Sequence, residues 1–225
     1  MELSIEAASD DMGVALSMDG VVALMATWET RQNHSVELLP NIDRLLAEAG
    51  RTKADVSAVF VDVGPGGYAG LRVGVSVAKA LAHALGVPLA GVGRLEIDAW
   101  GVAAEATGRR IVPVHRAGRG EVAWAAYRGD GASWVEEAAP RMSKPAALHE
   151  ALAAGDAVTG DIDDETAAAV ARVGAATVSA HRHRVVALAA LGARRLAAGR
   201  ADDPTALVPL YLRAPAIGPK RVEPS

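Results

Sequence analysis

The sequence predicts an α/β protein built of two lobes. The first half reads as three short strands followed by a helix, a strand, a helix and a strand, and a similar order recurs in the second half. A glycine-rich stretch over 64–72 joins a short β-branched run to a long apolar helix. The 225 residues, 51% of them hydrophobic and 22% charged, suffice to bury one large domain or two smaller lobes.

The first lobe is expected over 1–107 and begins with a three-stranded antiparallel meander. Turn-forming residues at 9–11 and 18–20 separate its strands. Ser35 is the expected N-cap of the first helix, and Pro40 is expected to bend that helix or delay its start. The expected strands are 3–7, 13–17, 21–28, 56–62 and 89–92, and the expected helices are 35–49, 71–85 and 94–107.

The second lobe is expected over 108–225. Gly129-Asp130-Gly131 is the expected hairpin turn, and the proline-rich tail from Val208 onward is expected to be irregular. The expected strands are 111–114, 121–127, 133–135, 157–160 and 175–179, and the expected helices are 144–154, 164–172 and 185–199. The final helix, 185–199, could pack on its own lobe or return to the first.

The helix expected over 71–85 has too few polar residues for an ordinary surface helix. Arg72, Ser76, Lys79 and His83 fall at i, i+4, i+7 and i+11, so they form one narrow stripe. The other side chains are apolar or small, and we expect this helix to be covered on nearly all sides. Burial within one domain would satisfy the pattern, and so would packing on its own sheet and on another chain.

The glycine-rich stretch reads Gly64-Pro65-Gly66-Gly67-Tyr68-Ala69-Gly70-Leu71-Arg72. Glycines between a strand and a helix allow positive φ and close backbone approach, and the helix start offers free N–H groups to an anion or a partner carbonyl. A tight structural turn explains the pattern equally well. No Gly-Lys-Ser/Thr follows the glycines, so the Walker pattern is absent, and the dinucleotide fingerprint is not convincing.

Composition excludes several classes of function. The net charge is −4, so the whole chain offers no broad field for nucleic acid. The absence of cysteine excludes disulfides and thiolate metal sites and is compatible with the cytoplasm. The N-terminal residues read as an acid-containing strand and not as a signal peptide, and no apolar run is long enough to span a bilayer.

A longer match extends from the glycine loop into the helix. The matching residues are Gly64-Pro65-Gly66-Gly67-Tyr68-Ala69-Gly70-Leu71-Arg72-Val73-Gly74, followed by Ala78-Lys79-Ala80-Leu81 and Gly86-Val87-Pro88-Leu89. This run resembles the TsaB (formerly YeaZ) family, whose members carry a GPGSFTGLRIG loop. Shorter segments at 34–43, 120–122, 159–161 and 209–213 match in the same order, so the resemblance covers most of the chain.

The resemblance implies a two-lobed actin-like/Hsp70-like/sugar-kinase-like (ASKHA) fold, in which each lobe is a mixed sheet with helices. It implies a cytoplasmic, non-catalytic subunit needed for making threonylcarbamoyladenosine beside the tRNA anticodon. The implied partners are a TsaD-type catalytic homologue, a TsaE-type ATPase, and tRNA reached through the complex. The isolated chain is expected to need no cofactor, because other subunits use the ATP and magnesium, and it is expected to have no membrane partner.

The resemblance implies that helices 35–49 and 71–85 form the surface that binds the partner. It also implies that the chain carries no catalytic residue and no metal ligand. The expected interface residues are Leu38, Ile42, Leu45, Leu46, Leu71, Gly74, Val75, Ala78 and Ala82. The expected glycine-loop residues are Gly64, Gly66, Gly67, Gly70 and Arg72. Without its partner, this apolar surface could pair with itself in a homodimer.

Two positions depart from the family pattern. Members commonly begin with an Ile-Asp-Thr-Ser-type strand and turn, but this chain reads Ile5-Glu6-Ala7-Ala8 and lacks the hydroxyls that could bind phosphate. An acid is expected where Arg116 stands, before the strand that starts at Glu121. Both changes weaken nucleotide binding and phosphoryl transfer, which need positioned donors and a metal-holding carboxylate.

Two alternatives stay open. One is a nucleotide-dependent enzyme or a metallopeptidase-like protein of the same superfamily. None of the six histidines forms a His-x-x-x-His pair, and His181-Arg182-His183 reads as a solvated basic turn. The other is direct tRNA contact through a basic patch, for which two arginine groups are candidates. They are Arg109, Arg110, Arg116 and Arg119, and Arg182, Arg184, Arg194 and Arg195.

Overall fold

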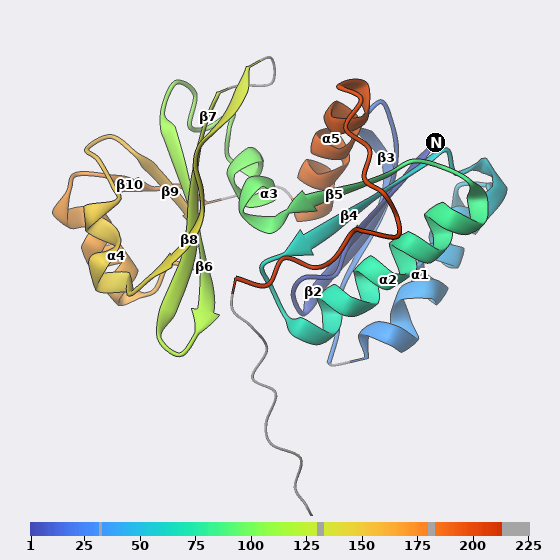
Figure 1. The fold of residues 1–225 in the computed structure, drawn as a ribbon, viewed down its shortest axis with the longest axis horizontal. Coiled ribbons are helices and arrows are strands. Elements are labelled where there is room, and N and C mark those ends of the chain that lie inside the picture. The colour runs from blue at the N-terminus through green and yellow to red at the C-terminus, as the bar shows by residue number, and fades with distance from the viewer. Residues whose placement is uncertain (32, 130–132, 180–182, 213–225) are drawn as a thin grey trace, which may run out of the picture.

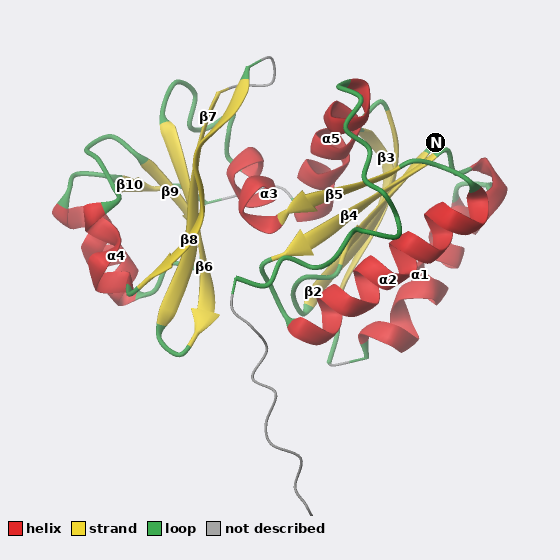
Figure 2. Ribbon diagram, in the orientation of Figure 1, coloured by secondary structure: helices red, strands yellow, loops and turns green. Residues whose placement is uncertain are grey.

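The structure, a computed structural model, describes residues 1–31, 33–129, 133–179 and 183–212. Figures 1 and 2 show two lobes side by side, each built on one five-stranded sheet. The hairpin turn expected at 129–131 and the basic turn at 181–183 lie mostly outside the described residues. Within the described ranges, no helix has the length and apolarity that crossing a membrane requires.

The sheet of lobe 1 has the strand order β3-β2-β1-β4-β5. Its first three strands are antiparallel, and β4 and β5 continue the sheet parallel to β1. Asp19 and Gly20 both have positive φ in the two-residue hairpin between β2 and β3, as a type I′ turn requires. The strands are β1 (Glu2–Glu6), β2 (Asp11–Met18), β3 (Val21–Glu29), β4 (Ala58–Gly64) and β5 (Leu89–Gly93).

Helices cover both faces of this sheet. Along β4, Val59 and Val61 pack with the helices of one face, and Phe60 packs with a helix on the opposite face, as the period of a strand requires. On the first face lie α1 (His34–Glu48) and α2 (Tyr68–Leu85), side by side in Figure 2. On the second face lies α5 (Arg184–Ala197), so the chain's final helix returns to lobe 1.

Lobe 2 is a second mixed sheet, with the strand order β10-β9-β6-β7-β8. Its outer face is covered by the 3₁₀ helix η2 (Pro145–Glu150) and by α4 (Asp164–Arg172). Helix α3 (Arg94–Gly101) covers the inner face and also contacts α5, so it links the lobes (Figure 1). The strands are β6 (Arg110–Gly118), β7 (Glu121–Gly129), β8 (Trp134–Ser143), β9 (Ala157–Gly160) and β10 (Ala176–Thr177).

Several boundaries differ from those expected. Helix α1 begins at His34, with Asn33 and not Ser35 as its N-cap, and Pro40 lies inside it. Proline removes the hydrogen bond that Val36 O would accept, and because Val36 is exposed, water can replace that donor. Helix α3 ends at Gly101 and continues as turns, and the region expected as helix 144–154 forms only the short η2. A short 3₁₀ helix, η1 (Lys53–Asp55), precedes β4.

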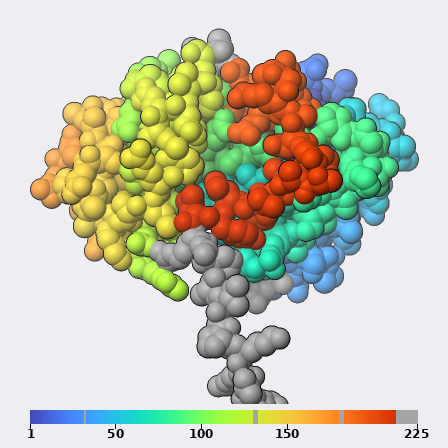
Figure 3. All heavy atoms as spheres, in the orientation of Figure 1, coloured from blue at the N-terminus to red at the C-terminus, as the bar shows by residue number. Residues whose placement is uncertain are grey.

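Residues 202–212, which we call the strap, follow α5. This segment forms no helix or strand beyond a single antiparallel bridge between Leu89 and Asp202. Figure 3 shows it lying on the surface across the front of the molecule, from α5 toward the edge of lobe 2. The strap therefore contacts parts of the chain that are distant in the sequence.

Outer helix face and interlobe cleft

The glycine loop is pressed against the turn between β1 and β2. Gly67 N donates to Ala8 O at 2.7 Å. A Cβ at Gly66 would clash with Ala8 O, and a Cβ at Gly70 would clash with Ala7 O and meet the His34 ring. These glycines therefore let two backbone segments touch. This geometry favours the interpretation of the loop as a tight structural turn.

The nine side chains predicted to contact a partner are core residues of lobe 1. The eight with a measured exposed fraction are at most 3% exposed, and Gly74 is also buried. The apolar stripes of α1 and α2 face their own sheet, as amphipathic helices on a sheet do. Periodicity alone cannot distinguish a sheet-facing stripe from a partner-facing one, and the assignment of these residues to a partner interface stays a prediction. The buried residues are Leu38, Ile42, Leu45, Leu46, Leu71, Gly74, Val75, Ala78 and Ala82.

The surface that these two helices do expose is mixed in character. We call it the outer helix face and define it by Val36, Leu39, Tyr68, Arg72 and Ser76, all of them exposed. Val36, Leu39 and Tyr68 are 70%, 42% and 44% exposed, which is high for such large apolar or aromatic side chains. Helix α2 is therefore not wholly covered by its own lobe. The polar stripe predicted for it lies partly on this face.

The floor of the interlobe cleft is made of charged groups at the carboxyl ends of two parallel strands. Burial raises the pKa of Glu6, at the end of β1, to about 7, although nearby Arg184 and Arg94 oppose the shift. Burial also raises the pKa of Asp62, on β4, and the nearby Glu6 adds to the shift. Asp62 Oδ1 accepts from Gly64 N at 2.7 Å, while Oδ2 has no partner among the described residues. These carboxyls lie close together at one edge of the sheet.

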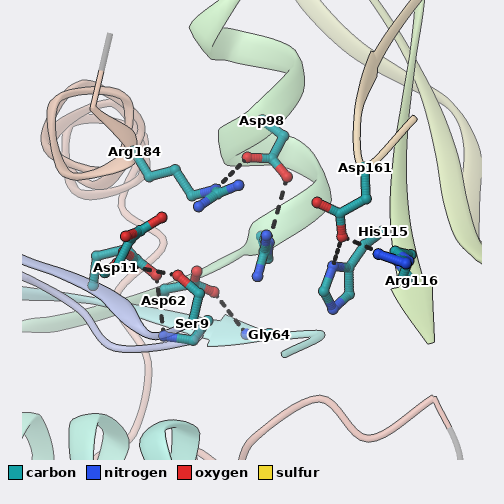
Figure 4. Close-up of polar contacts among 12 residues, drawn as sticks. Ser9, Asp11, Asp62, Gly64, Asp98, His115, Arg116, Asp161 and Arg184 are labelled. Atoms are coloured by element: carbon teal, nitrogen blue, oxygen red, sulfur yellow. Dashed lines mark hydrogen bonds and ion pairs between the residues drawn. The ribbon is translucent and has the colours of Figure 1, made fainter. Parts of the chain in front are cut away.

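Two arginines share one aspartate above this floor, as Figure 4 shows. Asp98 on α3 accepts from Arg184 Nε at 2.6 Å and pairs with Arg94 Nε at 3.5 Å. Arg94 is 3% exposed, so this pair is shielded from water. Because Asp98 and Arg184 lie 86 residues apart, their spacing in the sequence gives no signal for this contact.

The lobe 2 wall carries a paired histidine. His115 Nδ1 lies 2.7 Å from Asp161 Oδ2, and Arg116 N donates to the same oxygen at 3.0 Å. Burial acts to raise the pKa of Asp161, but the hydrogen bonds from His115 and Arg116 outweigh it and hold that pKa well below its usual range. In Figure 4 this pair lies across the cleft from Asp62.

The cleft combines hydrogen-bond donors with carboxylates, because its hollow of about 550 Å³ is lined by Arg94, His115 and Arg184 as well as by Asp11 and Asp161. A second hollow of about 430 Å³ is lined by Glu6, Asp11 and Asp98 as well as by Arg184. The Ser9 hydroxyl donates to Asp11 O within its own turn. Among the described residues, no cluster of three or more histidine, aspartate or glutamate side chains is placed to hold a metal ion. Ala7 and Ala8 stand where the family pattern has hydroxyl residues, so these two positions of the turn after β1 offer no side-chain donor to a phosphate.

Most of the arginines considered for RNA contact bind groups of the protein itself. Arg109 donates to Gly155 O and Asp156 O, and Arg110 pairs with Asp156 and Glu137. Arg195 pairs with Glu96. The Arg194 guanidinium lies over the Trp100 ring, and Arg182 lies outside the described residues. The structure thus favours intramolecular pairing over a free basic patch.

The raised pKa of Glu6 gives a prediction for the dependence of stability on pH. The folded protein holds a proton on Glu6 that the unfolded chain releases near pH 4.5, so the free energy of unfolding should fall as pH rises toward 7. We expect a loss of about 2–3 kcal/mol between pH 5 and pH 8. In Glu6→Gln the part of this loss that comes from Glu6 should disappear, while the part that comes from Asp62, whose pKa burial also raises, should remain.

Urea unfolding at a series of pH values measures this effect. Glutamine keeps an oxygen for the Ala8 N–H, which donates to Glu6 Oε1 at 3.0 Å in the wild type. Glu48→Gln, at an exposed position on α1, is the matched control and should follow the wild-type curve. If the free energy of unfolding depended on pH in the same way in Glu6→Gln and in the wild type, the raised pKa of Glu6 would be contradicted.

Comparison with known proteins was made against families, sequences and solved structures. Residues 28–162 match the model of the family described as TsaD, tRNA N6-adenosine threonylcarbamoyltransferase. The chain is 31% identical over 151 residues to the Escherichia coli tRNA threonylcarbamoyladenosine biosynthesis protein TsaB, covering 67% of this chain and 65% of that protein. It is 36% identical over 196 residues to the uncharacterized protein Rv3421c of Mycobacterium tuberculosis, covering 84% and 79% respectively. YeaZ from Pseudomonas aeruginosa superposes with a TM-score of 0.76 at 24% identity, covering 94% of this chain and 99% of that one.

Two lobes built on mixed sheets, with a cleft at the carboxyl ends of β1 and β4, place the protein in the actin-like/Hsp70-like/sugar-kinase-like class. Within that class, the chain belongs to the TsaB (YeaZ) family. The matched segments span 65% of the length of the E. coli TsaB protein and 54% of that of the Bacillus subtilis one.

Proposed function

We propose that this chain is a non-catalytic partner subunit required for threonylcarbamoyl transfer to tRNA, and that it supports a TsaD-type catalytic homologue. In this proposal a TsaE-type ATPase joins the assembly, and tRNA is reached through the complex. The chain itself needs no cofactor and makes no broad contact with RNA. The observation that carries the non-catalytic part is the cleft floor, where Ala7 and Ala8 replace hydroxyl residues and burial raises the pKa values of Glu6 and Asp62.

The chemistry of the cleft argues against the enzyme alternative. A transferase that handles phosphate or acyl-phosphate groups needs positioned donors and a metal-holding carboxylate set. In this cleft burial raises the pKa values of Glu6 and Asp62, which disfavours the ionised form that holds a metal, and Asp98 is already shared by Arg94 and Arg184. Among the described residues, no cluster of histidines and carboxylates is placed as in a zinc peptidase. The partner role therefore fits these residues better than an active site does.

The outer helix face is the surface that we assign to the partner. Three of the large apolar or aromatic side chains that the described residues expose, Val36, Leu39 and Tyr68, lie at the amino-terminal ends of α1 and α2. Aromatic residues and arginine are enriched at interface centres, and on this face the Arg72 guanidinium lies over the Tyr68 ring. Without a partner, the same face could bring two copies of the chain together.

Charge placed on this face should abolish docking without unfolding the protein. We expect the double variant Val36→Glu/Leu39→Glu to weaken association with the TsaD-type subunit at least about a hundredfold, because glutamates would be buried against the partner. Both positions are exposed on a helix, so the free energy of unfolding should change by less than about 1 kcal/mol. Calorimetric titration of the purified subunits measures the affinity.

Val135→Glu is the matched control, because Val135 is 55% exposed on β8 of the other lobe. This control should bind like the wild type. If the double variant and the control bound the partner equally well, the outer helix face would not be the docking surface. A purified lone chain that turned over ATP or a peptide would instead favour the enzyme alternative.

A further inference from the structure

The strap is anchored to lobe 1 by specific contacts at its beginning. Asp202 N donates to Leu89 O at 2.8 Å, and the Asp202 carboxylate accepts from Gly91 N at 2.8 Å. Leu207 packs against the core of lobe 1, over the space that a side chain at Gly91 would fill. Lys79 on α2 donates to Leu207 O at 2.8 Å. This part of the strap is therefore held on α2 and β5.

The strap then crosses from lobe 1 to lobe 2. Leu210 N donates to Val63 O at 2.7 Å, at the end of β4. The Tyr211 ring lies 5.3 Å from the Tyr68 ring, centroid to centroid, and Leu212 packs on the core of lobe 2. Figure 3 shows this crossing at the surface between the lobes. One short segment therefore contacts both lobes beside the glycine loop.

At Tyr211 the ring, and not the hydroxyl, makes the contact that this crossing uses. The Tyr211 hydroxyl is buried and has no hydrogen-bond partner among the described residues. Tyr68 also contacts the Arg72 guanidinium, which lies 4.4 Å from its ring centroid. A hollow of about 250 Å³ remains under the strap, lined by Pro65, His115 and Met142 among others. The lobe 2 side of the crossing is therefore loosely packed and has room to move.

We propose that the strap is a latch between the lobes, and that its closure prepares the outer helix face for the partner. Tyr68 takes part both in the contact with the strap and in the outer helix face. Tyr211 contacts its ring, yet Tyr68 remains 44% exposed on the outer helix face. Closing the latch fixes the Tyr68 and Arg72 side chains before docking, and a partner that binds the ordered face loses less conformational entropy. Opening it frees both the lobes and this face. The docking part of this inference rests on the proposed function.

The experiment compares two variants that differ in the aromatic contact. Tyr211→Ala/Leu212→Ala removes the tilted contact between the Tyr211 and Tyr68 rings and the lobe 2 contact. Tyr211→Phe keeps the ring and removes only the unpaired hydroxyl, so it is the matched control. The first readout is amide hydrogen exchange of the lone chain at Gly66, Gly67 and the β6 end around Ala117. The second is the affinity for the TsaD-type subunit, measured by calorimetric titration.

We expect the double alanine variant to exchange about tenfold faster at these amides, with exchange in the middle of α2 unchanged, and to bind the partner about tenfold more weakly. Tyr211→Phe should match the wild type in both readouts. Unchanged exchange in the alanine variant would overturn the latch, and faster exchange with unchanged affinity would overturn the coupling to docking. Failure of the proposed function is distinct, because the wild-type chain itself would then not bind the partner.

Discussion

Replacing Gly66 by alanine is expected to lower the free energy of unfolding by about 3 kcal/mol or more. An alanine Cβ at this position would overlap Ala8 O and approach the Ala8 Cβ at 2.8 Å. The obstacle is mainly backbone, which cannot rotate away as the end of a side chain can. The strand turn and the glycine loop would have to separate, with loss of the hydrogen bond from Gly67 N to Ala8 O. Overpacking that moves backbone costs at the upper end of the range for core substitutions.

The adjacent glycine provides the control for this prediction. A Cβ at Gly67 would lie 3.7 Å from Ala8 O, an ordinary van der Waals contact, and Gly67 has an extended backbone that alanine adopts freely. Gly67→Ala should therefore change stability by less than about 1 kcal/mol. Urea unfolding of both variants measures the difference. Equal stability of the two variants would show that the loop does not press on Ala8 in solution.

Replacing Asp98 by alanine is expected to cost about 3–5 kcal/mol at pH 5. The variant leaves Arg94, which is 3% exposed, and Arg184 without their shared carboxylate. Removing one member of a buried ion pair leaves a charge that is neither paired nor hydrated, and this is the costly case. In the wild type burial raises the pKa of Glu6 to about 7, so Glu6 is a weaker counter-ion for the arginines at pH 5 than at pH 8.

Raising the pH should reduce this cost, since an ionised Glu6 can then attract both arginines. Asp43→Ala is the control, because it breaks the pair between Asp43 and Lys53, which are 56% and 45% exposed. That change should cost no more than about 1 kcal/mol. Denaturant unfolding of both variants at pH 5 and pH 8 tests the point. If Asp98→Ala lowered the free energy of unfolding no more than Asp43→Ala does, Asp98 would not be paired with Arg94 and Arg184 in a site shielded from water.

The parts of the fold that local patterns determine could be predicted from the sequence. The turn at Asp19 and Gly20 defines the first hairpin, and the glycine loop occurs where a strand-to-helix turn was expected. The helix around Pro40 shows the limit, because tertiary packing of α1 outweighs the local penalty of one proline. The repeated order of strands and helices predicted two α/β lobes, the resemblance predicted the actin-like class, and solved relatives confirm that class.

The site could be predicted less well, because it depends on contacts between distant residues. The apolar stripe that suggested a partner surface faces the sheet, and the residues exposed on the same helices include Val36 and Tyr68. The pairing of Asp98 with Arg184 needs two helices whose paired residues lie 86 positions apart in the chain. No local pattern marks the strap either, because its contacts reach back from Tyr211 to Tyr68. The departures at Glu6 and Arg116 were visible in the sequence, but their environment was not.

The most direct test of the central claim is co-expression of this wild-type chain with the TsaD-type protein of the same genome. Native mass spectrometry of the purified material shows which chains form one complex. The account predicts one species that contains both chains, formed without covalent links and stable enough to purify. Two proteins that are both folded yet recovered only as separate species would contradict it.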